Sequence, residues 1–142
     1  MAKHNNACLS VDSCYTIYML TGKKALIIED DEHISKVYEI KLSKEGIDVF
    51  IAHDGDEAMV KVLEKPDVII LDLMIPKKDG FSVLEDIKKN PDLSHIPVIV
   101  LSNLGQQQDQ DRAMALGANE YLVKVDYPIQ DVIEKIKGYL ST

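Results

Sequence analysis

Residues 67–80, with the sequence DVIILDLMIPKKDG, decide the fold of this chain. Their apolar run at residues 68–71 is rich in β-branched residues and is bounded by Pro66 before it and by Pro76 in the following loop. Such a short continuous run is typical of a strand buried on both faces of a parallel sheet. Asp72 directly follows the run, so we expect it at the carboxyl edge of the sheet, where open α/β folds bind ligands. Taken alone, Asp72 is equally compatible with a turn or a helix cap.

Strand-like and helix-like segments alternate on both sides of this stretch. Further apolar runs typical of strands occupy residues 25–28, 49–52, 98–101 and 121–123. Helical spacing of apolar residues, or a polar stretch with a glycine stop, predicts helices over residues 34–42, 58–63, 81–87, 106–116 and 129–140. This alternation indicates βαβ units, and hence a parallel sheet covered on both faces. Residues 23–142 are therefore expected to form one domain.

One predicted helix has a recognisable start. Asp54 is followed three residues later by Glu57, which resembles a capping box. We expect the helix that it opens to bury four apolar side chains, those of Ala58, Met59, Val62 and Leu63.

Residues 1–22 differ in composition from the rest and are predicted to be an extension outside the core fold. Asp12 interrupts any signal-peptide core, so secretion is not expected. We hypothesise that Met19 is an alternative start and that residues 1–18 are dispensable, which N-terminal sequencing of the natural protein tests. Cys8 and Cys14 have no partners at metal-ligand spacing, so they are expected to be free thiols, consistent with a cytoplasmic location.

The composition excludes two classes of partner. The 142 residues carry 16 Lys and Arg against 24 Asp and Glu, a net charge of −8. Nucleic-acid surfaces need clustered basic residues, so we expect no nucleic-acid binding. No stretch of the chain approaches the roughly 20 apolar residues of a membrane span, so we expect no membrane partner.

Chemically active side chains follow four of the five predicted strands. Glu29 and Asp30 follow the first, Asp72 the third, Ser102 the fourth and Lys124 the fifth. Each has an ordinary alternative: acidic residues stabilise a helix N-terminus, Ser caps helices, and Lys is mostly solvated. Because the carboxyl ends of parallel strands meet at one edge, a single shared site explains all of these placements better than independent roles.

These segments together resemble the receiver domain of two-component response regulators. The resemblance rests on LIIEDD at residues 26–31, IILDLMIPKKDG at 69–80, PVIVLSN at 97–103 and GANEYLVK at 117–124. It implies an α/β, flavodoxin-like, doubly wound sheet of five parallel strands in the order 2-1-3-4-5 with five helices.

The resemblance also implies a division of roles within the site. Asp72 is the expected phosphoacceptor, with Lys124 and Ser102 engaging the phosphoryl group. Asp30 and Asp72 are expected to bind Mg²⁺ directly, Glu29 through water, and Met74 through its backbone carbonyl. Crowded carboxylates repel one another, and a hard divalent cation with oxygen ligands relieves that repulsion.

Three further expectations concern switching and the reaction loops. Ser102 and Tyr121 match the pair that couples phosphorylation to a conformational change in this family. Val125 replaces the proline that usually follows the active-site lysine, so we expect either a trans peptide with a shifted loop or a strained cis bond. Met74 and Leu104 occupy positions that modulate hydrolysis, and neither can orient water, which predicts a long-lived phosphorylated Asp72.

The leading functional prediction is a single-domain response regulator rather than an enzyme with a separate substrate, because the chain ends at Thr142, just after the last helix. It would catalyse only its own Mg²⁺-dependent phosphorylation and slow dephosphorylation.

A sensor histidine kinase or phosphotransfer protein is the expected donor, with specificity near Ile34 and Tyr38. An unknown protein is the expected target, and a phosphorylation-dependent homodimer is possible. The alternatives are a non-phosphorylated pseudo-receiver that binds proteins and an FMN-binding flavodoxin-type protein, which lacks support because no Gly/Ser/Thr-rich loop follows the first strand.

Overall fold

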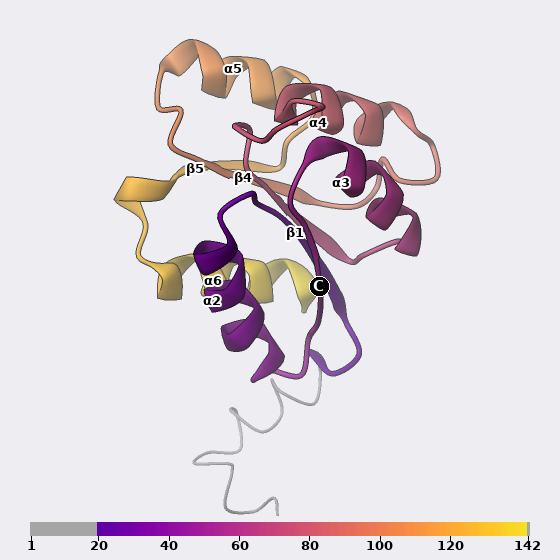
Figure 1. Ribbon diagram of the computed structural model, residues 1–142, viewed down its shortest axis with the longest axis vertical. Coiled ribbons are helices and arrows are strands. Elements are labelled where there is room, and N and C mark those ends of the chain that lie inside the picture. The colour runs from indigo at the N-terminus through magenta and orange to yellow at the C-terminus, as the bar shows by residue number, and fades with distance from the viewer. Residues whose placement is uncertain (1–19, 142) are drawn as a thin grey trace, which may run out of the picture.

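The computed structural model describes residues 20–141, which form a central sheet with helices on both faces (Figure 1). The strands are β1 (Lys24–Ile28), β2 (Asp48–Ala52), β3 (Val68–Leu71), β4 (Val98–Ser102) and β5 (Glu120–Val123). The α-helices are α2 (Glu32–Ser43), α3 (Gly55–Lys61), α4 (Gly80–Lys89), α5 (Gln107–Ala115) and α6 (Ile129–Leu140). Two short 3₁₀ turns, η2 (Val62–Glu64) and η3 (Lys124–Asp126), follow α3 and β5. None of the helices between residues 20 and 141 is both long and apolar enough to cross a membrane.

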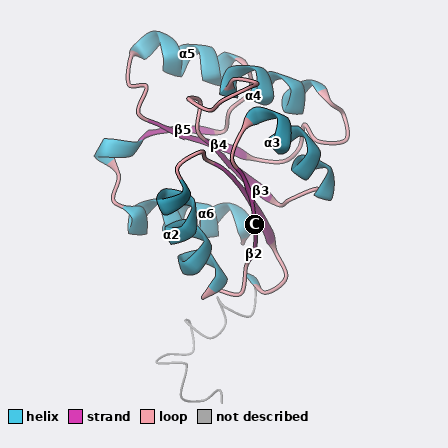
Figure 2. Cartoon of the chain, viewed as in Figure 1, coloured by secondary structure: helices cyan, strands magenta, loops and turns pink. Residues whose placement is uncertain are grey.

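The sheet has the predicted topology. Its five strands are parallel and follow the order β2-β1-β3-β4-β5, with β3 at the centre and all four of its residues buried. Figure 2 shows the strands stacked through the middle of the molecule, between the two helical layers. The α/β, flavodoxin-like fold with five helices predicted by the resemblance is confirmed.

Alternate residues of each strand face opposite helical layers, because successive side chains of a strand point to opposite faces. One layer contains α3, α4 and α5 and the other contains α2 and α6 (Figure 1). Between the sheet and the three-helix layer lies a first core, which includes Leu26, Ile69, Leu71 and Leu84. The second core lies against α2 and α6 and contains, among others, Ile27, Ile70, Leu42 and Ile136. Burial on both faces explains why the strands read as continuous apolar runs rather than as alternating patterns.

The predicted burial of Leu63 is wrong. Its side chain is 66% exposed, whereas Val62 beside it is fully buried. The α-helix ends at Lys61, and a 3₁₀ turn follows. The tighter winding rotates each residue further about the axis, which carries Leu63 past the edge of the buried face. The turn then stops at Lys65, which has a left-handed backbone with φ of 55°.

The predicted boundary at residue 22 cuts into the packed region. Leu20 is fully buried in the second core, and the Gly22 N–H donates to the Gly46 carbonyl at 3.2 Å. Gly46 has a φ of 84°, which lets the chain reverse after α2 and pass beside this segment. Residues 1–19, including Met19 and both cysteines, lie outside the described residues, so the division into an extension and a receiver domain stays a prediction.

Candidate functional site

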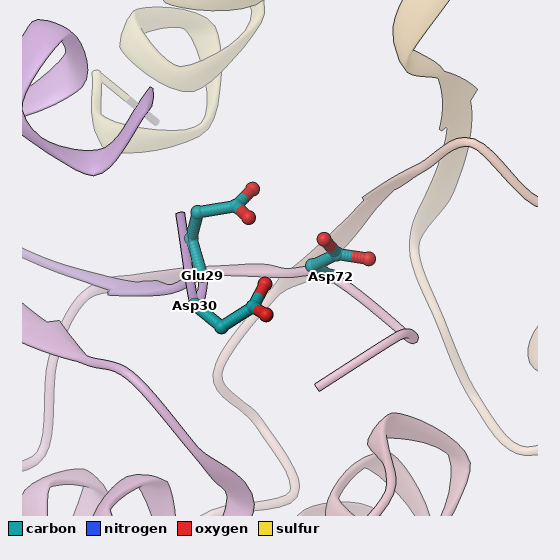
Figure 3. Close-up of side chains that lie close together, drawn as sticks. All are labelled: Glu29, Asp30 and Asp72. Atoms are coloured by element: carbon teal, nitrogen blue, oxygen red, sulfur yellow. The ribbon is translucent and has the colours of Figure 1, made fainter. Parts of the chain in front are cut away.

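Three carboxylates meet at the carboxyl edge of the sheet. Glu29 and Asp30 follow β1, Asp72 follows the neighbouring β3, and each offers an oxygen within 4.8 Å of the others. Figure 3 shows the three side chains at this edge. Glu29 and Asp72 are only 4% and 6% exposed, whereas Asp30 lies on the open side. The pairing of β1 with β3 creates the cluster, because it places the ends of the two strands side by side.

Lys124 bridges the two buried carboxylates. Its Nζ lies 2.6 Å from Glu29 Oε1 and 2.9 Å from Asp72 Oδ2. Burial opposes the charge on this ammonium group, but the hydrogen bonds that it donates to Glu29 and Asp72 outweigh burial and raise the pKa of Lys124. The lysine is therefore a fixed cation inside the site rather than a solvated surface charge.

The cluster is chemically suited to a divalent cation. Burial is the main cause that raises the pKa of Glu29 to about 7, and the charge on Asp72 adds to it, while the Lys124 hydrogen bond opposes it. Lys124 pairs with the two buried carboxylates of the cluster, and the third carboxylate, that of Asp30, lies close to them without contacting the lysine. Hard divalent cations prefer such carboxylate oxygens, so the side chains present fit a metal of this class.

The Asp72 carboxylate is held on both of its oxygens. Oδ1 accepts hydrogen bonds from the Met74 N–H at 2.9 Å and from Ser102 Oγ at 3.1 Å. Oδ2 accepts from Lys124. Ser102 is fully buried at the end of β4, and the N-cap of α5 is Gln106, so the alternative role of Ser102 as a helix cap is wrong.

The acidic residues that follow β1 serve two purposes, the start of α2 and the site. Asp31 is the N-cap of α2, where its Oδ1 accepts from the His33 and Ile34 N–H groups at 2.9 and 3.2 Å. The Asp31 N–H in turn donates to Glu29 Oε2 at 3.2 Å. Asp31 therefore stabilises the start of α2 and also helps to orient Glu29.

Tyr121 lies on β5, the strand next to β4, where it pairs with Val100 and Ser102 pairs with Val123. Tyr121 and Ser102 are therefore not directly opposite each other in the sheet. The half-buried ring of Tyr121 packs against the first core, and its hydroxyl donates to the Leu104 carbonyl in the loop after β4. The Leu104 N–H lies 3.4 Å from Ser102 Oγ. The loop residue Leu104 thus connects the two residues of the predicted switch.

The remaining predicted positions have mixed outcomes. The side chain of Met74 is 58% exposed, and the use of its carbonyl as a ligand stays a prediction. Among the described residues every peptide bond is trans, which settles the Lys124–Val125 bond as trans.

Tyr38 is only 3% exposed and packs in the second core, so the prediction that it faces a kinase is wrong, whereas Ile34 is partly exposed. Burial and the charge on Glu29 raise the pKa of Tyr38 to about 12.

Sequence reasoning missed the contacts that shape the loop between β3 and α4. Asp79 is the N-cap of α4 and accepts from the Ser82 N–H at 3.2 Å. The Gly80 N–H donates to the Leu73 carbonyl at 3.1 Å, and a Cβ on Gly80 would lie only 2.4 Å from Leu73 Cα. The signal was the Asp-Gly pair at residues 79–80, which combines a cap with a residue that permits close backbone approach.

Comparison with known proteins places this site in a family context. The family model for the response regulator receiver domain matches residues 25–137. A probable transcriptional regulator, ycf27 of Guillardia theta, is 41% identical over 120 residues, which are 84% of this chain and 44% of that protein. The chain thus spans less than half the length of this curated relative.

Solved structures are similar over most of the chain. The Mn²⁺-bound form of the response regulator Rcp1 is 34% identical and has a TM-score of 0.70, covering 82% of this chain and 90% of that one. The BeF₃-activated N-terminal receiver domain of Klebsiella pneumoniae RstA is 26% identical with a TM-score of 0.76, covering 84% of this chain and 100% of that one. A divalent metal has therefore been seen in a protein similar to this chain.

Proposed function

This chain belongs to the response regulator receiver domain family, and on that premise we propose that it accepts a phosphoryl group on Asp72 and signals through a surface that phosphorylation changes. The donor is a sensor histidine kinase or a phosphotransfer protein, and the readout is binding of a protein target. The chain acts in the cytoplasm and catalyses only its own phosphorylation and dephosphorylation.

The observation that carries the proposal is the set of contacts around Asp72. A buried carboxylate at a strand end is fixed by a backbone N–H, a hydroxyl and an ammonium group. Any buried carboxylate needs hydrogen-bond donors, but these donors also meet at the sheet edge where two further carboxylates lie close to Asp72. Phosphoryl transfer depends mainly on positioning and on stabilising charge, and these donors supply both.

The chain's own residues account for each part of the transfer. An oxygen of Asp72 forms the new bond to phosphorus, while the bond from phosphorus to the donor breaks and its electron pair leaves with the donor. Lys124 and Ser102, which now donate to Asp72, are placed to pass their hydrogen bonds to the phosphoryl oxygens. Once Asp72 is phosphorylated, Lys124 no longer pairs with its carboxylate. The phosphoryl oxygens then accept hydrogen bonds from Lys124 and Ser102.

Mg²⁺ is the proposed cofactor. Asp30 and Asp72 would hold it directly, Glu29 through water and Met74 through its backbone carbonyl, and the ion supplies positive charge for the phosphoryl oxygens. The oxygen-only donor set and the shared negative charge of the carboxylates support this choice.

Incubation with acetyl phosphate and MgCl₂, followed by intact mass measurement, tests the proposal. One adduct of about 80 Da per chain is expected, because a single aspartate accepts one phosphoryl group. A protein that stays unmodified while remaining folded is a pseudo-receiver, and co-purification of a yellow flavin would instead favour the flavodoxin-type alternative. Either result would overturn phosphoryl acceptance.

The phosphorylated form is expected to decay slowly. The Met74 side chain is exposed and Leu104 is half-buried, and neither side chain can hydrogen-bond a water that attacks phosphorus. Replacing Met74 by Asn adds such a group and should shorten the lifetime by about tenfold, which is less than the roughly 10²–10⁴-fold of a fully positioned acid–base group because an amide can orient water but cannot take its proton. Autodephosphorylation of the purified protein measures both lifetimes, and decay of the unsubstituted protein within seconds contradicts the prediction.

Occupation of the site is expected to move Tyr121. If Ser102 turns toward the phosphoryl group, the loop at Leu104 shifts and the hydrogen bond from the Tyr121 hydroxyl is weakened. Beryllofluoride with Mg²⁺ should therefore change the NMR signals of the Tyr121 ring. Tyr139 lines a pocket at the opposite edge of the sheet with Lys23 and is the internal control.

Ser102→Ala should reduce the change at Tyr121 even when beryllofluoride still binds. Retention of the full Tyr121 response in that variant would reject coupling through the hydroxyl. An unchanged Tyr121 ring in the unsubstituted protein with the site occupied would reject the switch itself.

The surface beside the site is suited to a protein donor. Ile34 of α2 lines an apolar cavity of about 170 Å³ together with Lys124 and Tyr127. A phosphate donor must approach Asp72 from this open side of the sheet. Although the relative ycf27 is named a probable transcriptional regulator, the net charge of −8 supports a protein rather than DNA as the partner of this chain.

A further inference from the structure

The loop between β3 and α4 rests on the first turn of α3. The N–H of Gly55 donates to the Pro76 carbonyl at 3.1 Å. A Cβ built on Gly55 would lie 1.9 Å from the Lys78 carbonyl oxygen and 2.5 Å from Lys78 Cβ. The loop and the helix are therefore in backbone contact that only glycine permits, because real Cβ atoms do not approach other atoms so closely.

The contact replaces a hydrogen bond that α3 cannot supply itself. Gly55 is the first residue of α3, and the first N–H groups of a helix have no partner inside it. Asp54, the N-cap, accepts from the Glu57 N–H at 2.8 Å through Oδ1. The Asp54 Oδ2 lies 3.5 Å from the Nζ of Lys77, so the same cap residue also holds the loop.

The loop is held at both ends in a conformation that it would not adopt freely. Lys77 has a φ of 68°, a left-handed value that costs a non-glycine residue about 1–2 kcal/mol. At the other end of the loop, the Gly80 N–H donates to the Leu73 carbonyl. Met74 lies in the same loop, two residues after Asp72, and its N–H fixes Asp72 Oδ1. A change in how the loop sits on α3 is therefore transmitted to the oxygen ligands of the site.

We propose that Gly55 is a positioning residue for the metal site: by lacking a side chain it lets the loop rest on α3, which fixes the Met74 backbone and the orientation of Asp72. Gly55 does not touch the metal or the phosphoryl group. The inference rests on the proposed function, since it assumes that Asp72 and the Met74 carbonyl bind Mg²⁺.

Gly55→Ala should weaken Mg²⁺ binding by about tenfold, the lower end of the effect of residues that orient metal ligands. Isothermal titration calorimetry of the full chain with MgCl₂ measures the affinity, and urea unfolding measures stability. Gly138→Ala is the matched control, because a Cβ on that helical glycine meets nothing within 4 Å. It should bind Mg²⁺ as the unsubstituted chain does.

A second control separates positioning from stability. Val62→Ala removes buried volume directly after α3 and leaves the Gly55 contact with the loop unchanged, so it should lower the free energy of unfolding and leave Mg²⁺ affinity unchanged. Wild-type affinity in folded Gly55→Ala overturns the inference. An equal loss of affinity in Val62→Ala also overturns it, because stability alone would then explain the effect.

Hydrogen exchange tests the same coupling without any substitution, and it decides the question if Gly55→Ala does not fold. The Gly55 N–H donates to the Pro76 carbonyl of the loop and to no other acceptor within residues 20–141, so its exchange rate reports that contact. Saturating MgCl₂ should slow its exchange several-fold relative to the Gly138 amide, and equal rates with and without Mg²⁺ overturn the inference. Failure of the unsubstituted chain to bind Mg²⁺ would overturn the proposed function itself, and the inference with it.

Discussion

Replacement of Asp72 by Asn is expected to abolish the adduct of about 80 Da that acetyl phosphate and Mg²⁺ produce on the unsubstituted chain. The amide has no nucleophilic carboxylate oxygen, so no acyl phosphate can form at this position. Intact mass measurement under identical conditions gives the result directly. The expected loss is complete, which makes this the largest effect predicted for any single substitution.

The contacts of Asp72 indicate that the Asn variant keeps its fold. The amide oxygen can still accept from the Met74 N–H and from Ser102 Oγ. Only the oxygen facing Lys124 becomes an amide NH₂, and Lys124 retains Glu29 at 2.6 Å. Loss of phosphorylation therefore reports the missing nucleophile rather than a collapsed site.

Asp92→Asn is a suitable control for the same change of charge. Asp92 lies on the exposed surface after α4, where its own N–H donates to Asn90, and it has no part in the site. This variant should be phosphorylated like the unsubstituted chain. An adduct of equal size in Asp72→Asn would move the acceptor to another residue and reject the proposed role of Asp72.

The site was predictable from the sequence because residues that follow parallel strands must lie at the carboxyl edge of the sheet, whatever their side-chain conformations. Once the apolar runs are assigned to a parallel sheet, Glu29, Asp72 and Ser102 must reach one edge, and the register of β1, β3 and β4 places them there. Lys124 follows from the same rule at the end of β5. What the rule cannot supply is the pairing of individual atoms, such as the separate donors on the two oxygens of Asp72.

The features that sequence reasoning missed depend on contacts between elements. Leu63 matched the apolar pattern of its helix, but the change to 3₁₀ winding turned it outward. Gly55 was not singled out in the sequence, because the contact of Lys78 with it depends on how the loop lies against α3. Tyr38 matched helical periodicity, yet its depth in the second core depends on how α2 packs against α6. Periodicity identifies a buried face but not its edges or the loops that cross it.

Replacement of Lys124 by Met is expected to slow phosphorylation and to destabilise the metal-free protein. Removing one group that stabilises charge in a transition state commonly lowers a rate by about 10²-fold. The substitution also leaves Glu29 and Asp72 close together, nearly buried and without their shared cation. Loss of one partner from a buried ion pair costs roughly 3–5 kcal/mol when the remaining charge cannot be neutralised.

The loss of stability should depend on pH, because a carboxyl group can take up a proton instead. The pKa of Glu29 is already raised from 4.5 to about 7 in the presence of Lys124, and removal of the lysine raises it further. A carboxyl group with a raised folded pKa favours the folded state below its unfolded pKa and loses that advantage as pH rises through the folded value. The two free energies of unfolding should therefore run nearly parallel with pH below about 7, where Glu29 is protonated in both folded proteins, and that of Lys124→Met should fall increasingly below that of the unsubstituted chain as pH rises through 7 toward 8.

Urea unfolding in the presence of a chelator, repeated at pH 5, 6.5 and 8, measures this difference in stability. Lys89→Met is the matched control, because Lys89 pairs with Glu85 at 2.7 Å on the exposed surface of α4. An exposed ion pair contributes about 0–1 kcal/mol, so the control should show a small and nearly constant loss. A Lys124→Met variant with the pH profile of the control would mean that Lys124 does not neutralise the buried carboxylates, and unchanged phosphorylation would remove it from the proposed mechanism.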